Sequence, residues 1–340
     1  MGATTLYERW GATLFGAPLP AEPKATCASC AMASPDMGDE RFDPQTKCCT
    51  YLPILPSYLV GRALLDADPA AARGRASIAA RIKRRTAVTP FGLGRPRAMA
   101  LLHQGRSEAA FGRSGALLCP HFVADGGACG IWKHRNGACT AYFCKHDRGA
   151  VGARFWGAFA DLLGAVERAL VRHCAVALDV GGDALLRLCA SPEADARGRE
   201  IDGVVDDATY AALWGSWAGR EEAYFRACAD VVEPLSWGEV VAIGGAEIAA
   251  FAQAARAARA SLDDRALCAR VHVPELHVIR RKDDVVRLRG YSATDPIDVP
   301  RATFDALARA DGATIDEAGL DDATARALLD FGVLRPRSRD

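Results

Sequence analysis

The chain has 340 residues, of which 50% are hydrophobic and 25% charged, and its 42 basic residues balance 42 acidic ones. Ordinary hydrophobicity without net charge excludes a largely disordered chain, and the charge balance creates no overall field that would attract nucleic acid or an anionic membrane. The unusual feature is the presence of 12 cysteines.

Residues 1–150 are rich in Gly, Pro and Cys, and long stretches of them follow neither a helical nor a strand period. This composition predicts an irregular region that needs something besides an apolar core, such as a metal, to hold it together. The N-terminus lacks the basic and apolar segments of a secretory signal, and no apolar run approaches the length of a membrane span. We therefore expect a cytoplasmic protein without membrane contact, where disulfides are rare.

From about Val151 the sequence becomes helical. Apolar residues recur at spacings of three and four between Phe155 and Leu170, and further helices are predicted roughly over 208–217, 221–232 and 246–262. We expect residues 151–265 to form a helical domain.

The C-terminal segment changes texture again. Short β-type runs over 276–279 and 285–288 predict a hairpin, and a helix is expected from Pro300 through Leu307. Thr314–Glu317 has the form of a capping box, and a last helix is predicted over 322–331. The fold class we expect is therefore mainly α with an irregular, metal-stapled N-terminal region (1–150) and a small α+β, winged-helix-like C-terminal module (266–340).

The cysteines divide into two sets. Four are solitary and are predicted to be buried core residues on helices: Cys174, Cys189, Cys228 and Cys268. The other eight are grouped near the N-terminus and are predicted metal ligands: Cys27, Cys30, Cys48, Cys49, Cys119, Cys129, Cys139 and Cys144.

The grouped cysteines have the spacing of metal ligands. The CxxC of Cys27 and Cys30 lets two thiolates from one turn reach one metal ion. Adjacent side chains such as those of Cys48 and Cys49 tend to point apart, so the pair fits a multi-iron centre more easily than one tetrahedral ion. Thiolates suit both zinc and iron–sulfur clusters. We expect an iron–sulfur cluster, of the 4Fe–4S type, with zinc as the alternative.

The order CxxC, CC, Cys119 and then Cys129-x-Ile131-Trp132-x-x-Arg135-x-x-x-Cys139 resembles the YkgJ-type cysteine-cluster family, which is thought to chelate zinc or iron. Trp132 stands where that family usually has Tyr, Asn136 where it has Pro, and the spacing between Cys30 and Cys48 is longer. The resemblance covers roughly residues 25–147. It implies metal binding at the eight cysteines and a distant likeness to flagellin lysine N-methylase-type iron–sulfur proteins, but it implies no specific reaction.

Other residues near the motif carry weaker signals. His121, His134 and His146 could ligate a metal or be ordinary surface or loop histidines, and Arg135 could hydrogen-bond cluster sulfurs or pair with a carboxylate. No acidic residue occurs between Asp68 and Glu108, a stretch that carries many arginines. This stretch is either a solvated basic face or a site for an anionic ligand, with the glycines of the 89–96 loop allowing close approach to that ligand. Because it contains almost no aromatic residues, nucleic acid is not expected as a partner.

Two functions follow from these patterns. The first is an iron–sulfur protein with a redox or modifying role on an anionic small molecule or a peptide. The second is a protein whose zinc ions staple the N-terminal half while the helical half meets a partner, without catalysis. The sequence identifies no catalytic acid or base for either.

Overall fold

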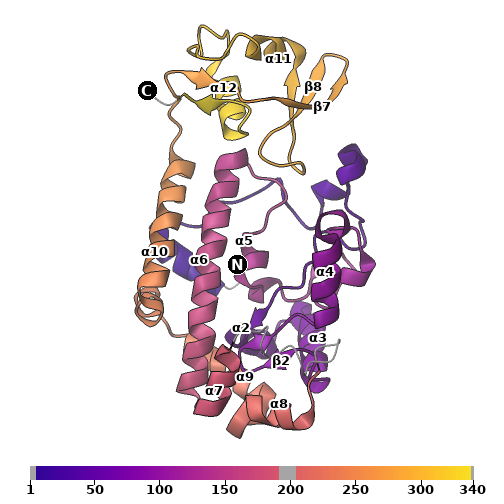
Figure 1. The fold of residues 1–340 in the computed structure, drawn as a ribbon, viewed down its shortest axis with the longest axis vertical. Helices are drawn as coiled ribbons and strands as arrows, with labels where there is room; N and C mark the ends of the chain where they lie inside the picture. The colour runs from indigo at the N-terminus through magenta and orange to yellow at the C-terminus, as the bar shows by residue number, and fades with distance from the viewer. Residues whose placement is uncertain (1–4, 191–203, 338–340) are drawn as a thin grey trace.

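The computed structural model describes residues 5–190 and 204–337, apart from the side chains of 105–109. The molecule is mainly α-helical with small antiparallel sheets, and its long helices run side by side along the longest axis (Figure 1). This arrangement agrees with the mainly α class predicted from the sequence.

Two long helices form the frame of the molecule. Helix α6 (Gly149–Ala177) packs along α10 (Trp237–Asp263), and its buried face includes the predicted apolar residues from Phe155 to Leu170. Helix α9 (Glu221–Val232) packs against α2 (Ser57–Leu65). The shorter α7 (Gly182–Cys189) and α8 (Asp207–Trp214) contact each other at the end of α6 that is lower in Figure 1.

The N-terminal region contains more regular structure than the sequence predicted. It forms α1 (Leu6–Phe15), α3 (Ala72–Lys83), α4 (Arg97–Ala110) and α5 (Gly137–Ala141), besides α2. Short strands complete it: β1 (Leu55–Pro56), β2 (Val88–Thr89) and β3 (Gly92–Leu93) in the order β1-β3-β2, and the β4 (Phe122–Val123) and β5 (Ala128–Cys129) pair. The irregular segments that remain are those that carry most of the cysteines.

Residues 266–337 form a compact end module. A three-stranded antiparallel sheet, ordered β7-β8-β9, consists of β7 (His277–Lys282), β8 (Val285–Arg289) and β9 (Ile297–Pro300). Helices α11 (Arg301–Leu307) and α12 (Asp322–Asp330) follow, and β6 (Val271–His272) pairs with β10 (Arg335–Pro336). The capping-box hydrogen bonds between Thr314 and Glu317 form as predicted, but the segment makes turns rather than a helix.

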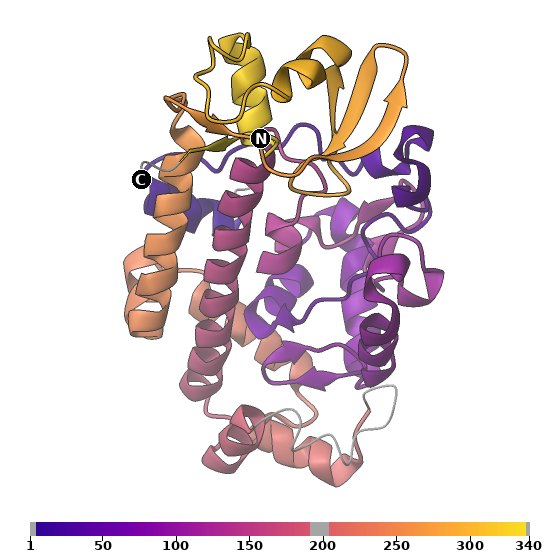
Figure 2. The same cartoon turned by 45° about the horizontal axis from the view of Figure 1, so that its top comes forward.

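The buried apolar residues form two clusters. One runs from Leu6 to Leu262 and the other from Val271 to Leu334. Residues 1–150 and 151–265 therefore share one core, whereas the end module has its own. Figure 2 shows the module lying across one end of α6 and α10.

Helix α10 differs from the prediction in length and character. It begins at Trp237 behind a capping box of Ser236 and Glu239, and it continues through a kink at Gly245, whose φ is 60°. Among the described residues it is the one helix long and apolar enough to cross a membrane by length and composition, which the sequence reading did not anticipate. This is weak evidence, because the core helix of a soluble protein passes the same test.

Candidate metal centre

The eight grouped cysteines lie on segments that meet in space, and each is partly buried. Cys27 and Cys30 lie on the loop before a short helical turn, and Cys48 and Cys49 lie on turns before β1. Cys119 precedes the β4–β5 hairpin, Cys129 ends it, Cys139 lies on α5 and Cys144 follows α5. Most of the ligand candidates therefore sit at the ends of elements, where the backbone can turn.

Backbone hydrogen bonds join the two groups of cysteines. The N–H of Cys119 donates to the carbonyl oxygen of Cys49 over 2.7 Å. The Lys47 ammonium donates to the carbonyl oxygens of Cys27 at 2.6 Å and Gly127 at 2.7 Å. The early and late cysteine segments are thus neighbours. Their spacing in the sequence did not show whether the two groups would lie together.

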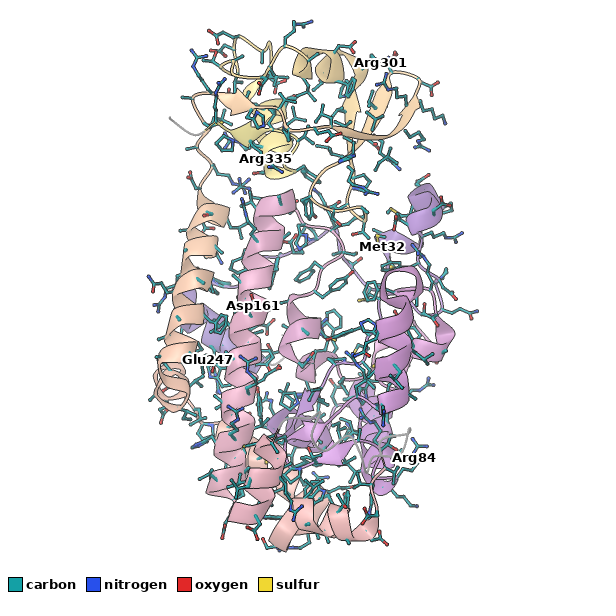
Figure 3. The ribbon with its side chains drawn as sticks, viewed as in Figure 1. Met32, Arg84, Asp161, Glu247, Arg301 and Arg335 are labelled. Atoms are coloured by element: carbon teal, nitrogen blue, oxygen red, sulfur yellow. The ribbon has the colours of Figure 1, made fainter. Side chains whose placement is uncertain are left out.

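The CxxC loop is held from its C-terminal side. The side chain of Met32, labelled in Figure 3, is completely buried, and its carbonyl oxygen accepts a hydrogen bond of 2.8 Å from the N–H of Phe42. The Phe42 ring in turn packs edge-on against Phe111, with ring centroids 5.5 Å apart. Apolar packing thus ties the loop to the end of helix α4.

Helix α3 packs closely against the hairpin that carries Cys119 and Cys129. A Cβ atom on Gly74 would lie 2.0 Å from the carbonyl oxygen of Gly130, so only glycine permits this approach. The N–H of Gly130 donates over 2.8 Å to the carbonyl oxygen of His121 and closes the hairpin. The position of Cys129 therefore depends on a residue in a helix far away in the sequence.

The thiols are close enough to influence one another electrostatically. Cys48 is central: it interacts with Cys27, Cys49, Cys129, Cys139 and Cys144. Further interactions link Cys119 to Cys49 and Cys139, and Cys30 to Cys144. Even so, nowhere in 5–190 or 204–337 are three or more His, Cys, Asp or Glu side chains grouped so that they could hold a metal ion.

Burial controls the protonation of these thiols. It raises the pKa of Cys119 to about 11 and those of Cys139 and Cys144 to about 12. Cys48 differs, because a hydrogen bond with Cys49 lowers its pKa to about 7, while the same bond raises the pKa of Cys49. Since a metal binds the thiolate form, loading this site would displace protons from most of its ligands.

Positive charges and backbone N–H groups surround the sulfurs. Burial raises the pKa values of Cys27, Cys129 and Cys139, and the positive charge of Arg135 partly opposes this rise; Arg135 also contributes to the lowered pKa of Cys48. Burial raises the pKa values of Cys119 and Cys129, and a hydrogen bond from the backbone N–H two residues later opposes this rise at each thiol. Both features favour the negatively charged thiolate.

The three candidate histidines are buried, and His121 and His146 lie in turn or loop segments, so they are loop histidines but not surface ones. His121 lies 2.7 Å from the Ser77 hydroxyl through Nδ1, and burial lowers its pKa to about 3. His134 contacts Asp66 at 2.9 Å, and His146 contacts the Tyr291 hydroxyl at 2.9 Å. In the described part of the chain, His121 Nε2 is a buried nitrogen without a hydrogen-bond partner.

The arginine-rich stretch serves mainly structural contacts. Arg81 is buried and donates to the carbonyl oxygens of Thr86 and Gly94. Arg95 donates to the carbonyl oxygen of Leu52 at 2.7 Å, and Arg85 pairs with Asp207. Gly92, one of the two glycines in the 89–96 loop, is required by packing, because a Cβ there would lie 2.0 Å from the carbonyl oxygen of Leu55 in β1. The close approach is to the protein's own backbone.

Two of the four solitary cysteines are buried core residues on helices and two are not. Cys174 and Cys228 are buried on α6 and α9 as predicted, and the Cys174 thiol lies 3.8 Å from the carbonyl oxygen of Cys228. The prediction was wrong for the other two, because Cys189 is exposed and Cys268 is only partly buried in a non-helical segment.

A buried polar cluster beside α5 has no signature in the sequence. The Tyr7 hydroxyl donates to Glu167 Oε1 at 2.5 Å and lies 3.0 Å from the Tyr58 hydroxyl. The same Glu167 oxygen accepts from the N–H of Gly137 at 2.5 Å, at the start of the helix that carries Cys139. Burial raises the pKa of Glu167 to about 7. Glu167 lies on the helix facing the motif, so only the tertiary fold reveals it.

The end module also reaches the cysteine region. The Thr294 hydroxyl donates to the carbonyl oxygen of Cys144 at 3.3 Å, and Lys145 donates to the carbonyl oxygen of Thr294 at 2.9 Å. The N–H of His146 donates to Asp295 at 3.1 Å.

Comparison with protein families, with curated proteins and with solved structures finds no match to this chain.

Proposed function

We propose that this protein binds a thiolate-ligated metal centre, an iron–sulfur cluster of the 4Fe–4S type, and uses it in a redox or modifying role on an anionic small molecule or a peptide. The observation that carries the proposal is that the early and late cysteine groups lie next to each other. The backbone N–H of Cys119 donates a hydrogen bond to the carbonyl oxygen of Cys49. Cysteines that only fill an apolar core would not be expected to come together from separate segments next to the same positively charged side chains.

The donor set has the chemistry that such a centre requires. The candidate ligands are the eight cysteines named above, and because one 4Fe–4S cluster takes four thiolates, the eight would serve two clusters or one cluster with four further thiols. Arg135, Lys47 and the N–H groups near Cys119 and Cys129 would offset the negative charge of the bound thiolates. A bound iron–sulfur cluster would supply one-electron transfer. The chain's own contribution is to hold the sulfurs apart from bulk water and to place cations beside them.

Zinc is the second candidate, and the β4–β5 hairpin favours it. Each of Cys119 and Cys129 accepts a hydrogen bond from the N–H two residues later. Such turns also suit a structural zinc ion, and eight thiolates suffice for two Cys₄ sites. In this version the metal staples the N-terminal region, the helical half binds a partner, and no catalysis takes place.

Metal analysis of protein purified without oxygen tests the proposal. We expect a brown preparation with broad visible absorption from thiolate-to-iron charge transfer, and with iron and acid-labile sulfide in stoichiometric amounts. A colourless preparation with stoichiometric zinc would support the second candidate and refute the first. Protein that binds neither metal, even after anaerobic reconstitution, would refute both.

A further inference from the structure

A cavity of about 340 Å³ lies directly beside the cysteine region. Its walls come from helix α1, from the 19–22 loop, from α2 and from the motif segment between Cys129 and Cys144. The volume is within the range of small-molecule sites. Arg135 lines this cavity and also interacts with four of the grouped thiols, so its side chain is shared by the cavity and the cysteine region.

Two arginines line the cavity, and each keeps a guanidinium nitrogen that has no hydrogen-bond partner within the described part of the protein. The Nε atoms of Arg62 and Arg135 are both buried, and neither has a hydrogen-bond partner in the described part of the chain. Arg62 pairs with Glu233 through a terminal nitrogen, which leaves its Nε free. The Arg135 guanidinium stacks over the Trp132 ring at 3.6 Å and has no acidic partner among the described residues.

The acidic groups of the same cavity are already engaged. Glu22 accepts from the Trp156 indole at 2.7 Å and from the N–H of Asp147 at 2.6 Å. Glu8 accepts from the N–H of Thr5 at 2.7 Å as part of the α1 capping box. The groups of the cavity wall that lack a partner therefore belong to positively charged arginines, and this favours an anionic ligand.

The remaining walls are aromatic. Tyr7, Trp132, Phe143 and Trp156 line the cavity, and they offer a large apolar surface to the body of a ligand. We infer that this cavity binds a small organic carboxylate with an aromatic or other apolar body, its carboxylate held by Arg62 and Arg135. The inference deepens the proposed function and depends on it for the chemistry, because it places the anion next to the metal centre. The binding itself requires only the cavity.

Titration of the purified full-length protein with phenylacetate tests the inference, with phenylacetamide as the neutral analogue of the same shape. The readouts are calorimetry and the fluorescence of the cavity tryptophans. We expect saturable binding of phenylacetate at least tenfold tighter than that of phenylacetamide and of inorganic phosphate. Equal affinity for the acid and the amide, no binding of the acid, or tighter binding of phosphate would each overturn the inference.

Variants locate the binding. Arg135→Gln and Arg62→Gln are each expected to weaken phenylacetate binding at least tenfold, and Arg135→Lys, which keeps the charge but loses the planar fork, to weaken it less. The matched control is Arg168→Gln, because Arg168 pairs at 2.6 Å with Glu247, which is labelled on α10 in Figure 3, and neither lines the cavity. If the Gln variants fail to fold, the Lys variant and phenylacetamide still decide the question.

Metal content measured on the same samples separates the two proposals. Carboxylate binding in protein that holds no metal would leave the cavity site standing and refute the proposed function. Lower metal content with unchanged phenylacetate affinity in Arg135→Gln would assign Arg135 to the thiolates alone and overturn its role in the cavity.

Discussion

At the residue scale, the distinction between grouped and solitary cysteines can be tested directly. Single substitutions to Ser of Cys48, Cys129, Cys139 and Cys144 are expected to lower metal content and to destabilise the protein, because metal binding contributes to folding. Cys174→Ser, at a buried cysteine outside the cluster, is the matched control and should leave metal content unchanged. Metal analysis together with urea unfolding measures both effects. Wild-type metal content in all four cluster variants would contradict the ligand assignment.

Glu167 gives a prediction about pH. Burial raises its pKa in the folded protein from 4.5 to about 7, so the folded state binds a proton more tightly than the unfolded chain does. Stability from this group is therefore complete below pH 4.5 and is lost as the pH rises towards 7. At about 1.4 kcal/mol per pKa unit, the loss approaches about 3 kcal/mol.

The substitution Glu167→Gln isolates this effect, since the amide oxygen can still accept from Tyr7 and Gly137. We expect the difference in unfolding free energy between wild type and variant to move in favour of the variant between pH 5 and pH 8. Titrating histidines affect both proteins equally and cancel in the difference. A difference that is flat across this range would mean that the folded-state pKa of Glu167 is not raised.

At the scale of elements, the contact between α3 and the β4–β5 hairpin decides where Cys129 lies. In Gly74→Ala the new Cβ would meet the Gly130 carbonyl oxygen at 2.0 Å, so the helix and the hairpin must separate. We expect a loss of stability of about 1–3 kcal/mol and lower metal content, measured by thermal unfolding and metal analysis.

Gly157→Ala is the control for this substitution. Gly157 is exposed in the interior of α6, and a Cβ there would meet nothing within 4 Å. The change should stabilise the protein by about 0.5–1 kcal/mol through helix propensity and leave the metal unchanged. Equal effects of the two substitutions would show that crowding at Gly130 is not the cause.

Elements with a self-contained signal were predictable, and those that depend on distant partners were not. Helix α9 matches its predicted range 221–232, because its apolar spacing is regular and Gly and Pro flank it. Helix α10 was predicted too short, at 246–262, because the residues before 246 lie beyond the kink at Gly245 and the helix in fact begins at Trp237. The capping box at Thr5 and Glu8 was a local signal for α1, although no helix was predicted there.

The candidate site divides in the same way. Its cysteines were found from their spacing, since ligand chemistry is local. Their convergence, the cavity at Arg62 and the buried Glu167 arise from packing between segments far apart in the chain, and no short pattern encodes them. The arginine-rich stretch was ambiguous for the same reason: the partners of Arg81 and Arg95 are backbone carbonyls, which leave no trace in the sequence.

At the scale of the whole molecule, one buried ion pair attaches the end module to the helical body. Arg148, just before α6, donates to both carboxylate oxygens of Asp330 on α12, at 2.9 and 2.6 Å, and also to the carbonyl oxygen of Asp264 at 2.8 Å. Asp330→Ala leaves a buried guanidinium without its counter-charge. We expect a loss of about 3–5 kcal/mol in urea unfolding.

The same variant should make the 264–270 segment more sensitive to limited proteolysis, because the module is then held less firmly. Asp263→Ala is the control, since the Asp263 carboxylate is exposed and pairs with Arg259 at i,i+4, and its loss should cost under about 0.5 kcal/mol. If both variants unfold at the same urea concentration, the ion pair does not anchor the module.

The hydrogen bond from Cys119 to Cys49 has a consequence for the order of events during synthesis. The first proposed ligands leave the ribosome well before the hairpin that must close over them, and loop closure between such distant residues waits until the intervening chain exists. The last, Cys144, touches a loop near residue 294 through its carbonyl oxygen, so its surroundings are complete only when the end module has been translated. Maturation of a metal centre here would therefore be a late step, and the nascent chain would carry reduced thiols that must be kept from oxidation until then.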